Sequence, residues 1–260
     1  MEEAGPDTRD VSAAEHPQRR PELEYLFSAS AARADAAGGG PGGEVEFVVF
    51  VVDSSGPLAA GISLDSEVGE IAQSAPGRRA AFLAGRACAR ACLVALGLDN
   101  RPIPRAADRS PVWPDGVTGS ITHTEGFVAA VAARTDRVVA GIDAERVERT
   151  GRDVRSRILT RAESERAERA GNPGLATMSV FSAKEAFYKA QHQVTEAWVG
   201  FQDVTSEVTD EGLELIPATS LEALSSFHWP ISANQMLVDG GPGGLTVMSA
   251  VAARPRPIGG

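Results

Sequence analysis

Residues 76–100, PGRRAAFLAGRACARACLVALGLDN, form the most strongly periodic segment of the chain. Small and apolar residues return there every three or four positions, at Ala81, Phe82, Gly85, Cys88, Ala89, Cys92 and Leu96. This period predicts an α-helix with one buried face. Pro76 and Gly97 stand where helices commonly begin and end. The arginines of the segment are predicted on the helix surface, at Arg78, Arg79, Arg86 and Arg90.

Strand-like segments surround this helix. The run VEFVVFVV at 45–52 is β-branched and aromatic, and 117–134 predicts two strands joined by a turn near Glu125 and Gly126. A second series follows, with a strand at 138–147, a helix or helix pair at 151–171, an amphipathic helix at 178–193 and strands near 199–208, 212–217, 231–238 and 245–253. The order strand, helix, strands thus occurs twice. This order predicts an α+β fold with two halves of similar plan.

The predicted boundary between the halves lies at residue 138. Residues 1–22 are charged, contain proline and lack any period, and we expect a disordered tail there. The N-terminal half then covers 23–138, and its glycine-rich stretch at 36–43 is expected to be a loop. The C-terminal half covers 139–260.

The composition excludes several classes of protein. Apolar residues make up 43% of the chain and charged residues 23%, which is typical of a soluble globular protein. The net charge of −10 argues against a nucleic-acid-binding protein. No apolar run is long enough for a membrane helix, and the N-terminus lacks the apolar core of a secretion signal, so we expect a cytoplasmic protein. Cys88 and Cys92 are expected to be buried core residues rather than a metal or redox pair.

The segment FSAKEAFYKA holds Lys184 and Lys189, the two lysines of a chain that has 25 lysines and arginines in all. Lysine can lose its proton in a suitable environment, whereas arginine effectively cannot. Glu185 and Lys189 are four residues apart and share a helix face, so they are candidates for proton transfer and phosphate stabilisation. A surface ion pair is the simpler alternative. Lys184 lies about 100° around the helix from Glu185 and is a candidate phosphate contact.

The segment GIDAE places Asp143 and Glu145 on one face of the end of an apolar strand. Two carboxylates this close repel each other unless a cation lies between them, and Mg²⁺ binds such oxygens together with phosphate. The alternative is a solvated strand end in which a carboxylate pairs with Arg146.

Several residues of the N-terminal half are candidate phosphate contacts. Ser120 and His123 lie in GSITHT at a strand end, although a lone histidine is more often structural. Arg78, Arg86 and Arg109 could grip phosphate through bidentate guanidinium contacts, or could belong to a solvated surface. No Walker A loop, Rossmann glycine motif, GxSxG elbow or paired CxxC is present in the sequence.

Taken in order, the segments RRAAFLAGRACARACLVALG, PVWPDGVTGSITHTEGFVAAV, GIDAERV and FSAKEAFYKA resemble the 4′-phosphopantetheinyl transferases of the Sfp type, in the subgroup similar to enterobactin synthase component D. The resemblance runs from about residue 76 to 190. It implies a monomer of two pseudo-symmetric α+β halves with the active site in the cleft between them. It also implies a holo-[acyl-carrier-protein] synthase activity. The phosphopantetheine arm of coenzyme A would move to a serine of an apo acyl or peptidyl carrier protein, with adenosine 3′,5′-bisphosphate released.

The resemblance also implies roles for single residues. Asp143, Glu145 and Glu185 would hold Mg²⁺, with Mn²⁺ as an alternative ion, against the pyrophosphate. Glu185 would activate the carrier serine, directly or through water, and Lys189 would stabilise or protonate the leaving phosphate. The remaining contacts to coenzyme A would come from Arg78, Arg86, Arg109, Ser120, His123 and Lys184. The carriers would be those of fatty-acid, polyketide or nonribosomal-peptide synthesis, siderophores included.

Two other functions compete with this interpretation. A module that binds coenzyme A or a carrier without turnover is the first, and the complete set of Asp143, Glu145, Glu185 and Lys189 argues against it. The second is a Mg²⁺-dependent phosphotransferase that uses a nucleotide, against which the missing nucleotide-phosphate loop argues. The small trimeric type of acyl-carrier-protein synthase is not expected, because its chains have about half this length.

Overall fold

The computed structural model describes residues 47–53, 67, 69–124, 127–135, 138–147, 152–210, 212–239 and 244–256. The expected tail at 1–22 and the glycine-rich stretch at 36–43 lie outside these residues. The described chain combines helices with two β-sheets, which confirms the predicted α+β class. No helix among the described residues is long and apolar enough to span a membrane.

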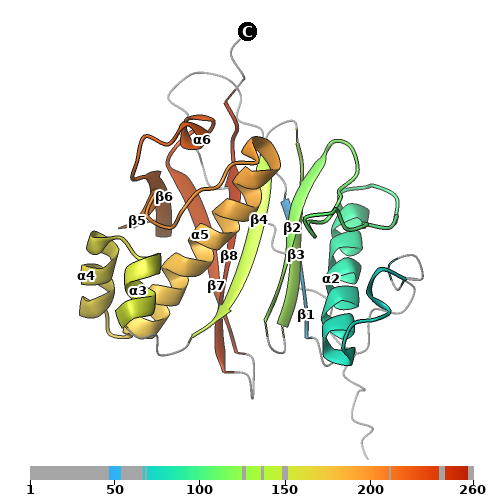
Figure 1. Cartoon of the computed structure of the whole chain (residues 1–260), viewed down its shortest axis with the longest axis horizontal. Helices are drawn as coiled ribbons and strands as arrows, with labels where there is room; N and C mark the ends of the chain where they lie inside the picture. Colours follow the sequence, from blue (N-terminus) through green and yellow to red (C-terminus); the bar gives the residue numbers. More distant parts are fainter. Residues whose placement is uncertain are drawn as a thin grey trace, which may run out of the picture.

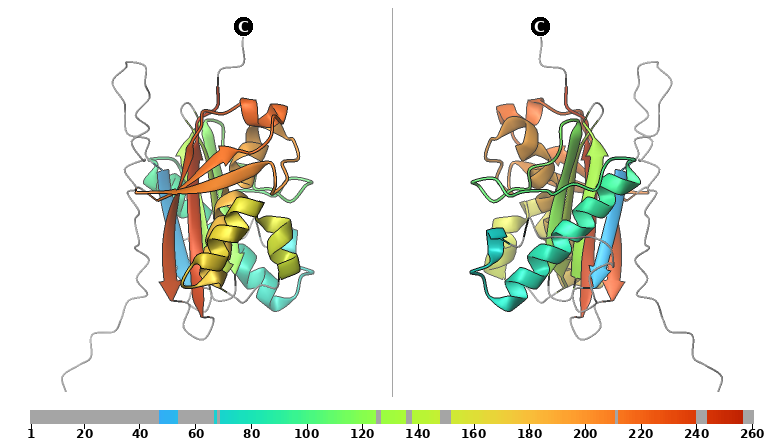
Figure 2. Two further views of the ribbon diagram at one scale, coloured as in Figure 1. Left: turned by 90° about the vertical axis from the view of Figure 1, so that its left-hand side faces the viewer. Right: turned by 90° about the vertical axis from the view of Figure 1, so that its right-hand side faces the viewer.

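The N-terminal half is a three-stranded antiparallel sheet with one long helix against it (Figure 1). The strands are β1 (Phe47–Asp53), β2 (Val117–Thr124) and β3 (Phe127–Arg134), in the order β1-β3-β2. A short 3-10 helix, η1 (Gly69–Ile71), precedes α2 (Pro76–Ala95). The right-hand view of Figure 2 shows α2 lying across the strands.

The predicted apolar stripe of α2 does form its buried face. Cys88 and Cys92 are buried free thiols, as predicted, and burial raises the pKa of Cys88 to about 12. The predicted surface position of two arginines is wrong, because Arg86 and Arg90 are only 4% and 5% exposed. Arg90 is compensated by an ion pair with Glu67, with 3.3 Å between Nη1 and Oε1.

The C-terminal half is a five-stranded antiparallel sheet in the order β4-β8-β7-β6-β5. Its strands are β4 (Val139–Arg146), β5 (Val204–Thr209), β6 (Gly212–Pro217), β7 (Ile231–Asp239) and β8 (Leu245–Ala253). Its helices are α3 (Arg152–Ile158), α4 (Arg161–Arg169), α5 (Pro173–Thr195) and the short α6 (Glu222–Ser225). The region predicted as a helix or helix pair is therefore a pair, α3 and α4.

Two predicted boundaries differ from the structure. Helix α5 begins at Pro173 rather than at 178, because Pro173 fits the first turn and the Asn172 side chain accepts a hydrogen bond from the Leu175 N–H at 3.0 Å. Strand β5 begins at Val204 rather than near 199. The preceding residues form a turn in which the Gly200 N–H donates to Asp203 Oδ2 at 2.8 Å.

The two sheets share a core. Alternate residues of β3 face opposite sides, so that Val128 and Ala130 pack under α2 while Phe127 and Val131 pack against β4 and β8. Helix α5 covers the other face of the larger sheet, with Phe187 at the centre of that core. The two halves therefore follow one plan, a sheet with a long helix on its outer face.

Helix α5 lies unusually close to β4 because position 141 is a glycine. A Cβ atom there would lie 1.9 Å from the backbone oxygen of Ala186 and 2.9 Å from the nitrogen of Ala190. The glycine of the GIDAE segment thus lets the helix that carries Glu185 and Lys189 rest on the strand that carries Asp143.

Candidate active site at the seam between the two sheets

Strand β4 has a different kind of neighbour on each edge. On one edge it forms an antiparallel backbone ladder with β8. On the other edge, side-chain hydroxyls of β2 accept hydrogen bonds from the backbone N–H groups of β4. These pairs are Thr118 with Ala140 at 3.3 Å, Ser120 with Ile142 at 2.6 Å and Thr122 with Ala144 at 3.2 Å. The constant offset of 22 residues shows that β2 and β4 run parallel, and we call this hydroxyl-linked junction the seam.

The hydroxyls of the seam also donate hydrogen bonds. Thr122 donates to Asp143 Oδ1 at 3.3 Å, and Thr118 donates to Gln193 Oε1 at 2.7 Å. Ser120 donates to the carbonyl oxygen of Ile142 at 3.4 Å. The N-terminal half therefore contacts both the acidic strand β4 and the helix α5.

Asp143 is the buried centre of this region, with 4% of its surface exposed. Its Oδ1 accepts a hydrogen bond from Lys189 Nζ at 2.5 Å, and Lys189 Nζ also donates to the carbonyl oxygen of Ile142 at 3.1 Å. Asp143 Oδ2 is buried and has no hydrogen-bond donor within the described structure. A buried carboxylate oxygen without a donor costs free energy of folding, which marks this atom as a position for a further cation or proton.

Glu185 lies one helical turn before Lys189 and is half-buried. Burial raises the pKa of its carboxyl group above the ordinary value, the charge of Asp143 raises it further, and Lys189 partly opposes both effects. The raised pKa makes the Glu185 carboxylate a stronger base than that of a free glutamate, which is a property that general-base catalysis uses.

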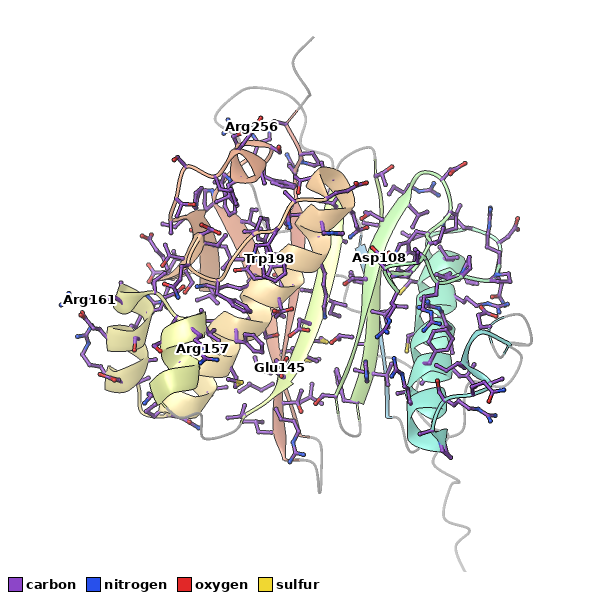
Figure 3. All side chains as sticks on the ribbon, viewed as in Figure 1. Asp108, Glu145, Arg157, Arg161, Trp198 and Arg256 are labelled. Atoms are coloured by element: carbon purple, nitrogen blue, oxygen red, sulfur yellow. The ribbon has the colours of Figure 1, made fainter. Side chains whose placement is uncertain are left out.

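Glu145 follows Asp143 by two residues and is half-buried near the end of β4 (Figure 3). Within the described residues, no group of three or more histidine, cysteine, aspartate or glutamate side chains is assembled closely enough to hold a metal ion. The predicted magnesium ligands Asp143, Glu145 and Glu185 therefore do not form a ready-made cage. The ammonium group of Lys189 neutralises Asp143 in this structure.

Lys184 differs from its predicted role as a phosphate contact. The residue is fully buried, and its Nζ donates to Glu163 Oε2 at 2.7 Å and to the carbonyl oxygens of Ile158 at 3.1 Å and Phe201 at 2.7 Å. An ammonium group has three N–H donors, so none remains for a phosphate. Lys184 anchors α5 to α4 and to the turn before β5.

The partner of Lys184 is equally well satisfied. Glu163 accepts the N–H of Thr160 at 2.7 Å as part of a capping box on α4, and the N–H of Ser206 at 2.6 Å. Burial raises the pKa of Glu163, but the charge of Lys184 and these hydrogen bonds outweigh it and lower the pKa overall. Burial lowers the pKa of Lys184, and Glu163 only partly offsets this.

Ser120 also differs from its prediction. It is 5% exposed, and both its hydrogen bonds go to the backbone of Ile142, so its hydroxyl holds the seam instead of pointing to a ligand. Its neighbour Gly119 is packed equally tightly, since a Cβ there would lie 2.3 Å from the Val131 backbone oxygen and 2.5 Å from the Trp113 ring.

The other predicted phosphate contacts stay predictions. His123 on β2, Arg78 in the first turn of α2 and Arg109 are exposed. Arg109 has a left-handed φ of 75° in the loop before β2, where Asp108 accepts hydrogen bonds from the N–H and hydroxyl of Ser110. Arg86 is buried, with its guanidinium 4.6 Å from the centre of the Phe82 ring.

Sequence reasoning missed Thr118, Gln193 and Glu163. Thr118, Ser120 and Thr122 alternate along β2 with a period of two, and hydroxyls at this spacing beside an apolar strand were a usable signal. Glu163 stands three residues after Thr160, the spacing of a capping box. No local pattern marks Gln193, apart from its place one turn after Lys189.

Comparison with known proteins assigns a family to both halves. The model of the 4′-phosphopantetheinyl transferase N-terminal domain matches residues 66–133, and the model of the 4′-phosphopantetheinyl transferase superfamily matches residues 140–235. The first match ends within β3 and the second begins within β4, so the seam joins the two matched regions.

Individual relatives agree with the family models. The chain is 39% identical to 4′-phosphopantetheinyl transferase PptT of Mycobacterium tuberculosis, over 57% of this chain and 67% of that protein. It is 36% identical to 4′-phosphopantetheinyl transferase Npt of Nocardia iowensis, over 54% and 64%. It is 37% identical to enterobactin synthase component D of Salmonella typhimurium, over 69% and 75%. The matches thus span roughly two thirds of these relatives.

Proposed function

Because the chain belongs to the 4′-phosphopantetheinyl transferase family, in its enterobactin-synthase-component-D-like group, we propose that it modifies carrier proteins. It transfers the 4′-phosphopantetheine arm of coenzyme A to a serine of an apo acyl or peptidyl carrier protein and releases adenosine 3′,5′-bisphosphate. The observation that carries this proposal is the contact between Lys189 and Asp143, one helical turn from Glu185. Glu185, which can accept a proton, and Lys189, whose positive charge can stabilise a phosphate, are thereby brought together.

The chemistry of the carboxylates fits Mg²⁺. Asp143 offers a buried oxygen without a donor. Glu145 follows it by two residues on β4, and Glu185 is close enough for the charge of Asp143 to raise its pKa. Carboxylate and phosphate oxygens are the ligands that Mg²⁺ prefers. These three residues would hold the ion, which when bound supplies positive charge to the coenzyme A pyrophosphate.

Proton transfer falls to Glu185 and charge stabilisation to Lys189. Glu185 takes the proton of the carrier serine, directly or through water, while the serine oxygen forms a bond to the phosphorus that bears pantetheine. The bond from that phosphorus to the bridging oxygen breaks. Lys189 stabilises the negative charge on the departing phosphate and can give it a proton.

The two halves divide the work of binding coenzyme A. Exposed Arg78, Arg109 and His123 of the N-terminal half contact its phosphates, and the C-terminal half provides the reacting groups. One chain supplies Asp143, Glu185 and Lys189, so these reacting groups need no second copy, and the enzyme acts as a monomer in this proposal.

The test is the intact mass of an apo carrier protein after incubation with this protein, coenzyme A and Mg²⁺. We expect the carrier to gain the mass of one phosphopantetheine group, and the Glu185→Gln variant to bind coenzyme A without producing this change. No mass gain on acyl and peptidyl carriers, with coenzyme A still bound, would identify a binding module and overturn the proposal.

A further inference from the structure

Gln193 uses every hydrogen-bonding capacity of its side-chain amide, although the residue is exposed. Its Oε1 accepts from the Thr118 hydroxyl at 2.7 Å and from the Gly119 N–H at 3.2 Å. Its Nε2 donates to the carbonyl oxygens of Ala140 at 3.1 Å and Lys189 at 2.8 Å. A primary amide has two N–H donors and two acceptor positions, so the set is complete. A surface glutamine with four protein partners is held in one orientation.

The partners of Gln193 belong to three different elements. Thr118 and Gly119 lie on β2 of the N-terminal half, Ala140 lies on β4, and Lys189 lies on α5 itself. Across the described ranges, both hydrogen bonds from β2 to α5 end on the oxygen of Gln193. This residue is therefore the polar link between the helix of one half and the edge strand of the other.

Gln193 and Lys189 lie on the same helix face and reach neighbouring carbonyls of the same strand. Lys189 donates to Ile142 and Gln193 donates to Ala140, two residues earlier on β4. A shift of the last turns of α5 along β4 would thus displace both side chains together. Fixing Gln193 against β2 therefore also fixes the position of Lys189 along β4 relative to the N-terminal half.

We infer that Gln193 is a positioning residue that holds Lys189 in register with the phosphate-binding side of the N-terminal half. This inference rests on the proposed function, in which coenzyme A is bound by both halves at once. Binding energy from the 3′-phosphate, which is remote from the reaction, can then be used to place the pyrophosphate against Lys189. A loosened link would weaken this use of binding energy.

The experiment compares coenzyme A with dephospho-coenzyme A, which lacks the 3′-phosphate, as substrates of wild type and Gln193→Leu. Leucine keeps much of the side-chain volume and removes all four hydrogen bonds. We expect kcat/KM for coenzyme A to fall about tenfold, with most of the loss in kcat, and kcat/KM for dephospho-coenzyme A to fall about twofold or less. The unequal response is the signature of lost register.

Two further variants separate the loss of this link from a general loss of folded protein. Thr118→Val removes one of the two hydrogen bonds from β2 to Gln193, together with the bond that Thr118 accepts from the Ala140 N–H. It should show the same unequal response, and the double variant with Gln193→Leu should lose less than the sum of the two single losses. Val194→Ala alters an exposed neighbour on α5 and should leave both substrates unchanged. Thermal melting of each variant checks that the protein compared is folded.

Equal losses on both substrates would overturn the inference, because general destabilisation of the site does not distinguish them. Wild-type rates for Gln193→Leu on both substrates would overturn it as well. Either result leaves transfer by the wild type, and hence the proposed function, intact. Absence of transfer by the wild type would instead overturn the proposed function and this inference with it.

Discussion

The two lysines of α5 have opposite surroundings. Lys184 is fully buried and gives its three N–H donors to Glu163 and two backbone carbonyls. The Lys189 side chain is 31% exposed and is paired with an aspartate that still has one buried oxygen without a donor. Glu163 is satisfied from all sides, whereas Asp143 is not.

This difference assigns one lysine of α5 to fold stability and the other to the reaction. A buried ion pair with complete hydrogen bonding does not readily exchange partners, because breaking it leaves an uncompensated charge. The Lys189 side chain is partly exposed, so its ammonium group can contact another anion, such as a phosphate, when a further cation neutralises Asp143. The same residue type therefore holds the fold at one position and serves the site at the other.

The largest expected effect comes from breaking the buried pair. Lys184→Met leaves the Glu163 carboxylate buried without its cation, and we expect a loss of about 3–5 kcal/mol in the free energy of unfolding. Urea denaturation measures this loss. Adding Glu163→Gln removes the stranded charge and should recover at least about 1 kcal/mol. If Lys184→Met unfolds like the wild type, the pair does not stabilise the fold.

The second-largest effect is expected at Lys189, where a substitution should lower the reaction rate more than the stability. Lys189→Arg keeps a positive charge near Asp143 but removes a group that can give up a proton, so kcat should fall about a hundredfold. The melting temperature should stay within a few degrees of the wild type, because the side chain is partly exposed. Carrier modification is followed by intact mass. A wild-type rate would show that proton donation by Lys189 is unimportant.

A third change should disturb both lysines at once. Gly141→Ala places a Cβ atom 1.9 Å from the Ala186 backbone oxygen, so α5 must move away from β4. We expect a loss of about 1–3 kcal/mol in stability, together with a lower rate, since Lys189 moves away from Asp143. Gly77→Ala is a matched control, because no atom lies within 4 Å of a Cβ at that position. Unchanged stability for Gly141→Ala would contradict the close packing of α5.

The smallest expected effect is the pH dependence of Glu185. A carboxyl whose pKa is raised on folding binds its proton more tightly in the native state, so stability falls as pH rises through the raised pKa. Glu185→Gln has no such proton and should be more stable than wild type at neutral pH in EDTA. The difference should vanish below the ordinary glutamate value of 4.5. A variant that is less stable at neutral pH would contradict the raised pKa.

Much of this fold follows from local patterns. The apolar period of 76–100 and the alternation in 117–134 predicted α2, β2 and β3, because both patterns reflect which face is buried. The start of α5 was placed five residues late, since Pro173 and Asn172 act through cap geometry rather than through period. The turn before β5 contains Val199, a buried residue that resembles the start of a strand.

The site was less predictable because it depends on which atoms meet across elements. Helical spacing separated Lys184 from Glu185 but could not show that Glu163, from another helix, lies against Lys184. Ser120 was expected at a phosphate because its partner, the edge of β4, cannot be seen in sequence. Spacing made Lys189, Asp143 and Glu185 candidates, and the resemblance gave them their roles. The structure adds the contact between Lys189 and Asp143.

The most direct measurement compares the two lysines in one assay of carrier modification per folded molecule. The folded double variant Lys184→Met/Glu163→Gln should modify the carrier within about threefold of the wild-type rate, because Lys184 lies outside the reacting groups. Lys189→Met leaves the buried Asp143 carboxylate without its cation and should lower the melting temperature, but its rate per folded molecule should fall at least about a hundredfold. Equal losses in both variants, or a fast Lys189→Met, would contradict the division of α5 into a stabilising and a chemical lysine.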